Sequence, residues 1–216
     1  MWYIEALRKI STASFTLRAN PKGGTLNLAI LPIFGTCWLA PDFQSFWHRI
    51  RASRSTLQTR FTFVDFGSEG LDAAIHFGPR DWAGVEMALL RSEEVVPACS
   101  PELKDQYGFR APGDLNKAPL LSISTRHNAW AGGSGQTIYF DQSAAVVPAA
   151  MVGVGAALLP TFLIQDELTT GKLVRALDLP MESAERYYLL WPPERSTYPP
   201  LMVFPDWLVA ETLADR

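Results

Sequence analysis

Residue types that could support catalysis are present, but they form no recognisable catalytic motif. The three histidines, His48, His76 and His127, lie far apart in sequence. The carboxylates nearest to them form no pair of the kind that general acid–base catalysis uses. The chain contains no Gly-x-Ser-x-Gly elbow, no His-Glu-x-x-His zinc motif and no phosphate loop ending in Gly-Lys-Ser/Thr. We therefore predict that the chain is not an enzyme.

Two glycine-containing segments match nucleotide-binding loops only in part. Residues 171–173 (Gly-Lys-Leu) lack the hydroxyl that would hold a magnesium ion. Residues 153–155 (Gly-Val-Gly) follow an expected helix, where the dinucleotide fingerprint requires a strand, so they predict a tight helix-to-strand turn. Cys37 and Cys99 are the only cysteines, with no metal-type spacing. We expect no cofactor, no bound metal, and a reducing, cytoplasmic location.

The groups that could bind a ligand must be positioned by alternating strands and helices. In the first half, apolar runs predict strands over residues 26–31, 56–63 and 73–77. Helical spacing predicts helices that include Trp38 to Trp47 and residues 64–70. Such alternation is typical of a parallel sheet with helices on its faces.

The second half repeats this pattern. Strands are expected over residues 95–99, 120–124, 139–140, 156–159 and 187–191, and helices over 142–152, 162–169 and 204–214. Asp141 and Thr161 are expected to cap two of these helices, and Pro205 to lie in the first turn of the last. Residues 144–164 carry no charge and are long enough to be a membrane candidate. Their prolines and glycines favour a buried helix, a turn and a strand instead.

Ligands bind open parallel sheets beyond the carboxyl ends of the strands, where helix N-termini and free backbone amides converge. This rule selects the following candidate ligand-binding residues: Ile33, Phe34, Gly35, Thr36, Thr59, Arg60, His76, Phe77, Gly78, Thr125, Arg126 and Ser143. The Thr36 hydroxyl could donate to a ligand, or it could simply cap a helix. Arg126 could clamp a carboxylate through two parallel hydrogen bonds, or it could be a solvated strand end.

The composition limits the possible partners. A chain of 216 residues with 48% hydrophobic and 19% charged residues is typical of a soluble globular protein with one large domain or two lobes. Its net charge of -3 provides no positive field for a phosphate backbone, so we expect poor binding of nucleic acid by this chain alone.

The segment Phe66 to Gly78 contains a helical turn that closes on glycine, then a strand that ends at a second glycine. Together with Val95 to Pro101 it resembles the effector-binding domain of LysR-type transcriptional regulators, particularly the glycine-cleavage-activator-like subgroup. Further matching blocks bring the resemblance to residues 20–214, and they comprise residues 28–41, 64–82, 94–103, 140–160 and 162–174.

This resemblance implies an α/β fold with two Rossmann-like lobes joined by two crossover strands, similar to type 2 periplasmic binding proteins. Residues 1–20 would form the end of a linker helix, residues 21–97 and 188–216 lobe I, and residues 98–187 lobe II. No counterpart of the family's DNA-binding helix-turn-helix is expected in this chain. Ile33 replaces the serine or threonine that many members carry, so Thr36 is expected to supply that hydrogen bond.

The expected function is that of a small-molecule sensor. The resemblance implies that an organic anion or amino acid binds between the lobes and shifts their orientation, and that a dimer or tetramer transmits this shift to separate DNA-binding domains. The dimer would pack the helix from Trp38 to Trp47 beside a lobe II helix of the partner. Two alternatives are a free-standing solute-binding protein and an enzyme on the same fold that uses His76 or Asp72.

Overall fold

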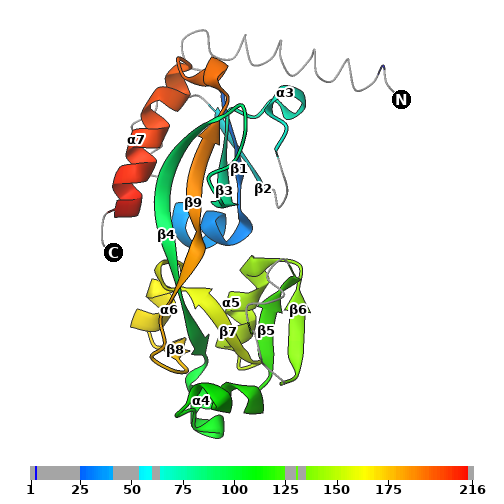
Figure 1. Cartoon of the computed structure of the whole chain (residues 1–216), viewed down its shortest axis with the longest axis vertical. Helices are drawn as coiled ribbons and strands as arrows, with labels where there is room; N and C mark the ends of the chain where they lie inside the picture. The colour runs from blue at the N-terminus through cyan, green and yellow to red at the C-terminus, as the bar shows by residue number, and fades with distance from the viewer. Residues whose placement is uncertain are drawn as a thin grey trace. The chain divides into compact units, whose positions relative to one another are not determined.

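The computed structural model describes residue 3 and residues 25–40, 54–59, 64–124, 130 and 135–213 (Figure 1). The chain divides into two compact units. The first unit comprises residues 1–31, 42–91 and 187–215, and the second comprises residues 32–41, 92–186 and 216. Two long strands, β4 (Glu86–Cys99) and β9 (Met181–Trp191), each run from one unit into the other.

The first unit is built on a largely parallel sheet. Its strands β1 (Thr25–Ile30), β2 (Arg54–Thr59) and β3 (Ala73–Gly78) join β9 and β4 in the order β2-β1-β3-β9-β4. The short helix α3 (Phe66–Glu69) precedes β3, and the 3-10 turn η5 (Pro193–Arg195) leads into the terminal helix α7 (Pro199–Leu213). Apolar residues of β1, β3 and β9 form one buried cluster with Val64 and Leu71.

The second unit has the strand order β4-β7-β5-β6, and β8 also pairs with β4. Its strands are β5 (Leu120–Ile123), β6 (Thr137–Phe140), β7 (Ala156–Pro160) and β8 (Val174–Arg175). Its helical segments are η1 (Phe34–Leu39), α4 (Pro101–Tyr107), η2 (Pro112–Lys117), α5 (Ser143–Met151), η4 (Thr161–Leu163) and α6 (Gln165–Thr169).

The structure confirms the helix, turn and strand expected within residues 144–164. Helix α5 ends at Met151, Gly153 adopts a left-handed φ of 79°, and β7 starts at Ala156. None of the described helices combines the length and the apolar character that a bilayer crossing requires.

Three expectations about helix ends were wrong. Helix α7 starts at Pro199, so Pro205 lies inside the helix and not in its first turn. Asp141 is not a cap, because Gln142 occupies that position and its side chain makes no capping bond. The Thr161 hydroxyl donates to the carbonyl of Glu94 at 3.2 Å, and the segment it begins is a 3-10 turn followed by α6.

Asp72 holds together the start of the sheet in the first unit. Its side chain is 2% exposed and accepts hydrogen bonds from the Asn27 backbone N–H at 2.8 Å and from the Asn27 side-chain amide at 3.2 Å. The Asp72 backbone N–H donates back to the Asn27 carbonyl at 2.8 Å. The other carboxylate oxygen pairs with Arg195 Nε at 3.3 Å. One buried carboxylate therefore joins β1, β3 and the segment that leads into α7.

Arg195 extends this connection to the start of β1. Its guanidinium lies 5.1 Å from the centre of the Tyr198 ring, and the Tyr198 hydroxyl donates to the Thr25 carbonyl at 2.8 Å. Burial raises the pKa of the Asp72 carboxyl above its ordinary value, although the hydrogen bonds from Asn27 and the charge of Arg195 act in the opposite direction. The carboxylate is therefore costly to bury, and its contacts with Asn27 and Arg195 offset part of this cost.

Gly155 sets the spacing at the start of the parallel strands in the second unit. A Cβ at this position would lie 2.5 Å from the Pro119 carbonyl oxygen and 2.9 Å from Leu121 Cδ2. The adjacent Ala156 N–H donates to that same carbonyl at 2.9 Å. Because the nearest obstacle is backbone, a side chain here could be accommodated only if β5 and β7 moved apart.

We predict that Asp72→Ala lowers the free energy of unfolding by about 2–4 kcal/mol, because the Asn27 N–H loses its acceptor inside the protein. Denaturant unfolding followed by circular dichroism measures this change. The matched control is Asp178→Ala, since the Asp178 side chain is 79% exposed and pairs with Arg175 at 2.6 Å. This control should cost no more than about 0.5 kcal/mol. Equal losses in the two variants would refute the role of Asp72.

The raised pKa also predicts a pH dependence. Because the folded state holds the Asp72 proton more tightly than the unfolded state, this carboxyl favours folding at acid pH. That contribution is lost as the pH rises through the raised pKa. Asp72→Asn keeps an acceptor oxygen for Asn27 and should therefore flatten this part of the stability profile above pH 3.8, the ordinary pKa.

A second prediction concerns Gly155. Gly155→Ala should lower the free energy of unfolding by about 2–3 kcal/mol, because its methyl group overlaps the Pro119 carbonyl. Gly113→Ala is the control, since a Cβ there meets no atom within 4 Å. It should be neutral or stabilising by about 0.5 kcal/mol. The same denaturant unfolding measures both variants. If Gly155→Ala is as stable as the wild type, the two strands can move apart without cost.

Candidate functional site

The strand order of the first unit creates a topological switch point at β1. This strand pairs in parallel with β2 on one side and with β3 on the other. Where the strand order reverses in this way, a crevice opens beyond the carboxyl end of the strand. Of the expected ligand-binding residues, Ile33 to Thr36 follow directly after β1 and therefore stand at this point.

The second unit has the same arrangement around β5. This strand pairs in parallel with both β6 and β7. The carboxyl end of β5 leads through Ser124 to Thr125 and Arg126. Those two expected site residues lie outside the described residues, as does Arg60 after β2. In the sequence, expected site residues therefore follow the central parallel strand of each unit.

The four candidate residues after β1 differ in what they can offer a ligand. Phe34 is fully buried, and its ring centre lies 4.8 Å from that of Trp38 and 6.4 Å from that of Phe162. Ile33 and Gly35 are also buried, whereas Thr36 is exposed. The Thr36 hydroxyl donates to the Pro32 carbonyl at 2.9 Å. Its proton is thus used inside the protein, while its oxygen can still accept a hydrogen bond.

The two candidate rings at the end of β3 each pack against another aromatic ring. The His76 ring meets Trp82 edge to face, with 4.9 Å between ring centres. The ring centres of Phe77 and Tyr187 are 4.7 Å apart. A Cβ on Gly78 would lie 2.5 Å from His76 Nε2, so the absence of a side chain makes room for the imidazole. Neither ring is displayed alone at the surface.

Two further candidates stand at element ends. Thr59 is the last residue of β2 and is exposed. Ser143 is the first residue of α5. In the same second unit the Cys37 thiol, next to Thr36, has its pKa raised by burial, which makes it a poor nucleophile.

The sequence did not reveal the groups that hold the strands in place. Asn27 and Asp72 are 45 residues apart, and no spacing rule connects them to Arg195. Trp130 donates from its indole nitrogen to the Leu121 carbonyl at 3.0 Å and packs on the core of the second unit. Among the described residues, no three His, Cys, Asp or Glu side chains are grouped so that they could hold a metal ion.

Comparison with known proteins identifies the same kind of domain. The family model described as LysR substrate binding domain matches residues 19–212. The transcriptional activator AmpR of Rhodobacter capsulatus is 29% identical over 88% of this chain and 69% of its own length. The glycine cleavage system transcriptional activator of Escherichia coli K12 is 27% identical over 98% of this chain and 73% of its own length.

Solved structures agree with this result. The AmpR effector-binding domain from Citrobacter freundii superposes with a TM-score of 0.76 at 24% identity, over 87% of this chain and 98% of that one. The AmpR effector domain of Pseudomonas aeruginosa gives a TM-score of 0.74 at 28% identity, over 87% and 95%. The expected α/β fold, similar to type 2 periplasmic binding proteins, is confirmed. The chain belongs to the LysR substrate-binding domain family and is the substrate-binding domain of a LysR-type transcriptional regulator.

Proposed function

We propose that this domain senses a small amino acid, or a closely related organic anion, through the residues that follow β1 and β5. The observation that carries the proposal is that both strands are topological switch points followed by expected site residues. In this proposal lobe I comprises residues 21–97 and 188–216, and lobe II residues 98–187. The two compact units divide close by, after Arg91 and Arg186, although residues 32–41 group with the second unit.

The hydrogen bonding of Thr36 favours an amino acid. While its proton is donated to the Pro32 carbonyl, its oxygen is available to accept from a ligand. An α-ammonium group is a donor that suits this oxygen. Arg126 would bind the carboxylate of the same molecule through its two-pronged guanidinium. His76, Phe77, Gly78, Thr59, Arg60, Thr125 and Ser143 are proposed as further contacts.

The enzyme alternative named His76 or Asp72, and Asp72 gives it no support. Asp72 is almost fully buried and bonded to Asn27 and Arg195, so both of its oxygens have partners. The similar proteins reported above are transcriptional regulators. We propose that the chain is not catalytic, that it acts in the cytoplasm, and that it reaches DNA through a separate domain.

We further propose that the domain forms a homodimer through α5. This helix carries no charged residue. Ala145 and Pro148 within it and Val152, the residue after its end, are all exposed. Val152 is 78% exposed, which is unusual for a β-branched apolar side chain. The expected partner surface around Trp38 is partly buried within the chain, since Trp38 is itself 3% exposed. Residues 41–47 of the expected helix lie outside the described residues, and the described neighbours Thr36 and Ala40 are exposed.

The effector proposal is tested with a thermal-shift screen of the twenty amino acids and of C4 to C6 dicarboxylates, followed by calorimetry with the best compound. Arg126→Gln should weaken binding of that compound by about 10- to 100-fold, which corresponds to one charge-assisted hydrogen-bonding group. Arg175→Gln is the control because Arg175 is paired with Asp178 on the surface of the second unit. Unchanged affinity in Arg126→Gln would reject the clamp.

The dimer proposal predicts that Val152→Glu shifts the protein towards monomer in analytical ultracentrifugation. A buried, unpaired carboxylate at an interface should raise the dimer dissociation constant at least about tenfold. Leu179→Glu is the matched control, because Leu179 is also an exposed apolar residue of the second unit. A Val152→Glu protein that sediments as the wild-type dimer would exclude α5 from the interface.

A further inference from the structure

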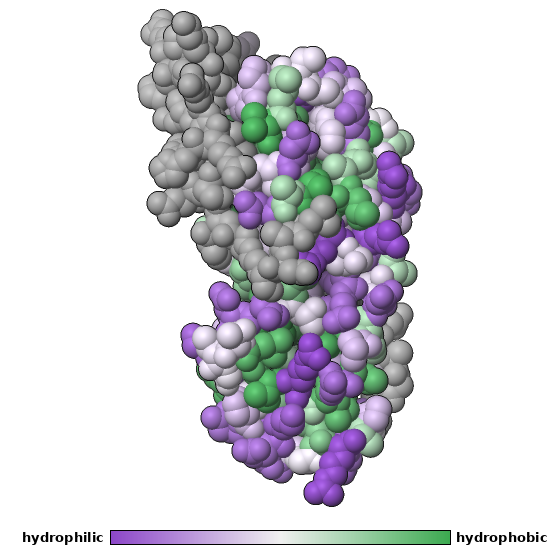
Figure 2. Space-filling view, turned by 90° about the vertical axis from the view of Figure 1, so that its left-hand side faces the viewer, coloured by the Kyte–Doolittle hydropathy of each residue, from purple (hydrophilic) through white to green (hydrophobic). Residues whose placement is uncertain are grey.

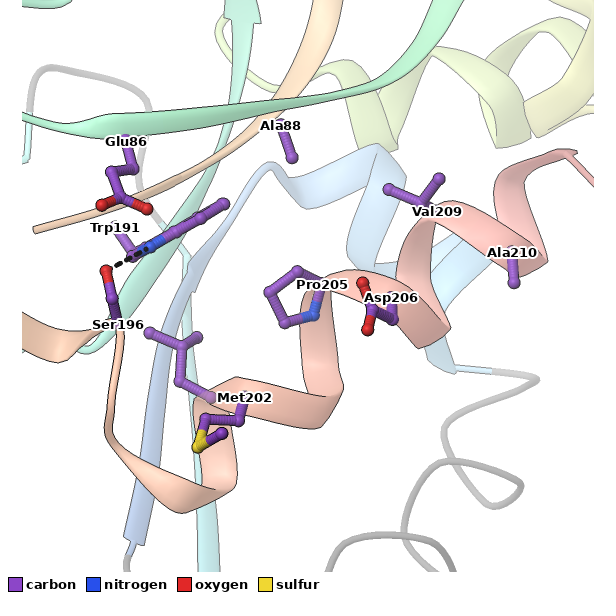
Figure 3. Close-up of a pocket in the computed structure, with 10 residues that line it drawn as sticks. Glu86, Ala88, Trp191, Ser196, Met202, Pro205, Asp206, Val209 and Ala210 are labelled. Atoms are coloured by element: carbon purple, nitrogen blue, oxygen red, sulfur yellow. Dashed lines mark hydrogen bonds between the residues drawn. The ribbon is translucent and has the colours of Figure 1, made fainter. Parts of the chain in front are cut away.

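An apolar groove of about 610 Å³ lies within the first unit, between β4 and the outer side of α7 (Figure 3). Ala88 of β4 and Trp191 at the end of β9 form one wall. Met202, Pro205 and Val209 of α7 form the other. Helix α7 contacts β1, and its residues Leu201 and Phe204 are buried. The groove lies on the side of α7 that faces β4.

The groove continues into exposed apolar surface. Met202 is 60% exposed and Val203 44%, both on α7. Figure 2 shows the side of the molecule that carries α7, where apolar residues interrupt the hydrophilic surface. Exposed apolar side chains on a helix beside an apolar groove are characteristic of a surface that another molecule covers.

The backbone beside this groove has unused hydrogen-bonding capacity. In the first unit β4 pairs with β9 along one edge, and its pairing with β7 covers only residues 95–98. Among the described strands, none pairs with the other edge of residues 86–90. Pro205 has no N–H, so the Leu201 carbonyl, four residues earlier and also in the groove lining, lacks its usual helical donor. An extended chain could pair with such an edge.

The charged residues that line the groove are both acidic. Glu86 and Asp206 carry the carboxylates, and none of the ten lining residues is basic. In Figure 3 Glu86 lies beside the Trp191 indole, whose N–H donates to the Ser196 hydroxyl at 3.2 Å. A carboxylate next to an aromatic face suits an ammonium or guanidinium group. Arg80 lines an adjoining hollow together with Glu86 and Trp191. Asp206 does not line that hollow.

We infer that this groove is a docking site for an extended segment of a partner protein in which basic residues alternate with apolar ones. Such a segment would add to β4 along residues 86–90, where no described strand pairs with that edge. Its apolar side chains would enter the groove, and its basic side chains would reach Asp206 and Glu86. A small molecule fits less well, because pockets for small molecules bury most of the ligand surface and this groove is open along its length.

The test measures fluorescence anisotropy with a labelled, end-capped peptide of sequence Arg-Leu-Arg-Leu-Arg-Leu. It should bind at least about tenfold more tightly than Arg-Ser-Arg-Ser-Arg-Ser or Glu-Leu-Glu-Leu-Glu-Leu, because only the first matches both the apolar walls and the charge. Met202→Glu and Asp206→Lys should each weaken it at least about tenfold. Both residues are exposed, so thermal melts should show that the two variants still fold.

The controls are Leu179→Glu and Asp105→Lys, which make the same changes at exposed positions of the second unit and should leave peptide affinity unchanged. Equal binding of the serine peptide, or equal losses in the control variants, would reduce the effect to net charge and overturn the proposal. Phenethylamine binding more tightly than the peptide would assign the groove to small cations instead. None of these results depends on the effector site, because no ligand is added.

Discussion

One buried carboxylate sets the geometry on which the candidate site of the first unit depends. Asp72 exchanges backbone and side-chain hydrogen bonds with Asn27 and forms an ion pair with Arg195. These contacts fix the start of β3 against β1 and give the register Leu28 to Ala73. Because side chains alternate along a strand, a slip of one residue would move each of His76 and Phe77 to the other face of the sheet. The burial of a charge is therefore linked to the position of residues at the far end of the strand.

The second unit reaches the same arrangement by steric means. Gly155 lets β7 approach the Pro119 carbonyl, and Ala156 then bonds to that carbonyl. Close packing replaces the ion pair, so the two units fix their parallel strands with different chemistry. In both, the result is a central strand with a parallel neighbour on each side, and hence a crevice at its carboxyl end.

Local patterns in the sequence were sufficient to predict most strands and the helix-turn-strand around Gly153. They failed where polar residues lie within a long element. The first halves of β4 and β9 contain Glu86, Arg91 and Glu185, so only their apolar last parts were expected as strands. The destination of the Thr36 hydroxyl was equally hidden, because the competing acceptor is the carbonyl of Pro32 and its position depends on the turn after β1.

The residues that stabilise the fold and those proposed to bind a ligand lie at opposite ends of neighbouring parallel strands. Asp72 precedes β3 and Gly155 precedes β7, whereas Thr36 follows β1 and Arg126 follows β5. Contacts at the amino ends fix strand register without occupying the crevice. Substitutions at the carboxyl ends can therefore alter what is bound at little cost in packing, since Thr36 is exposed and bonds only locally.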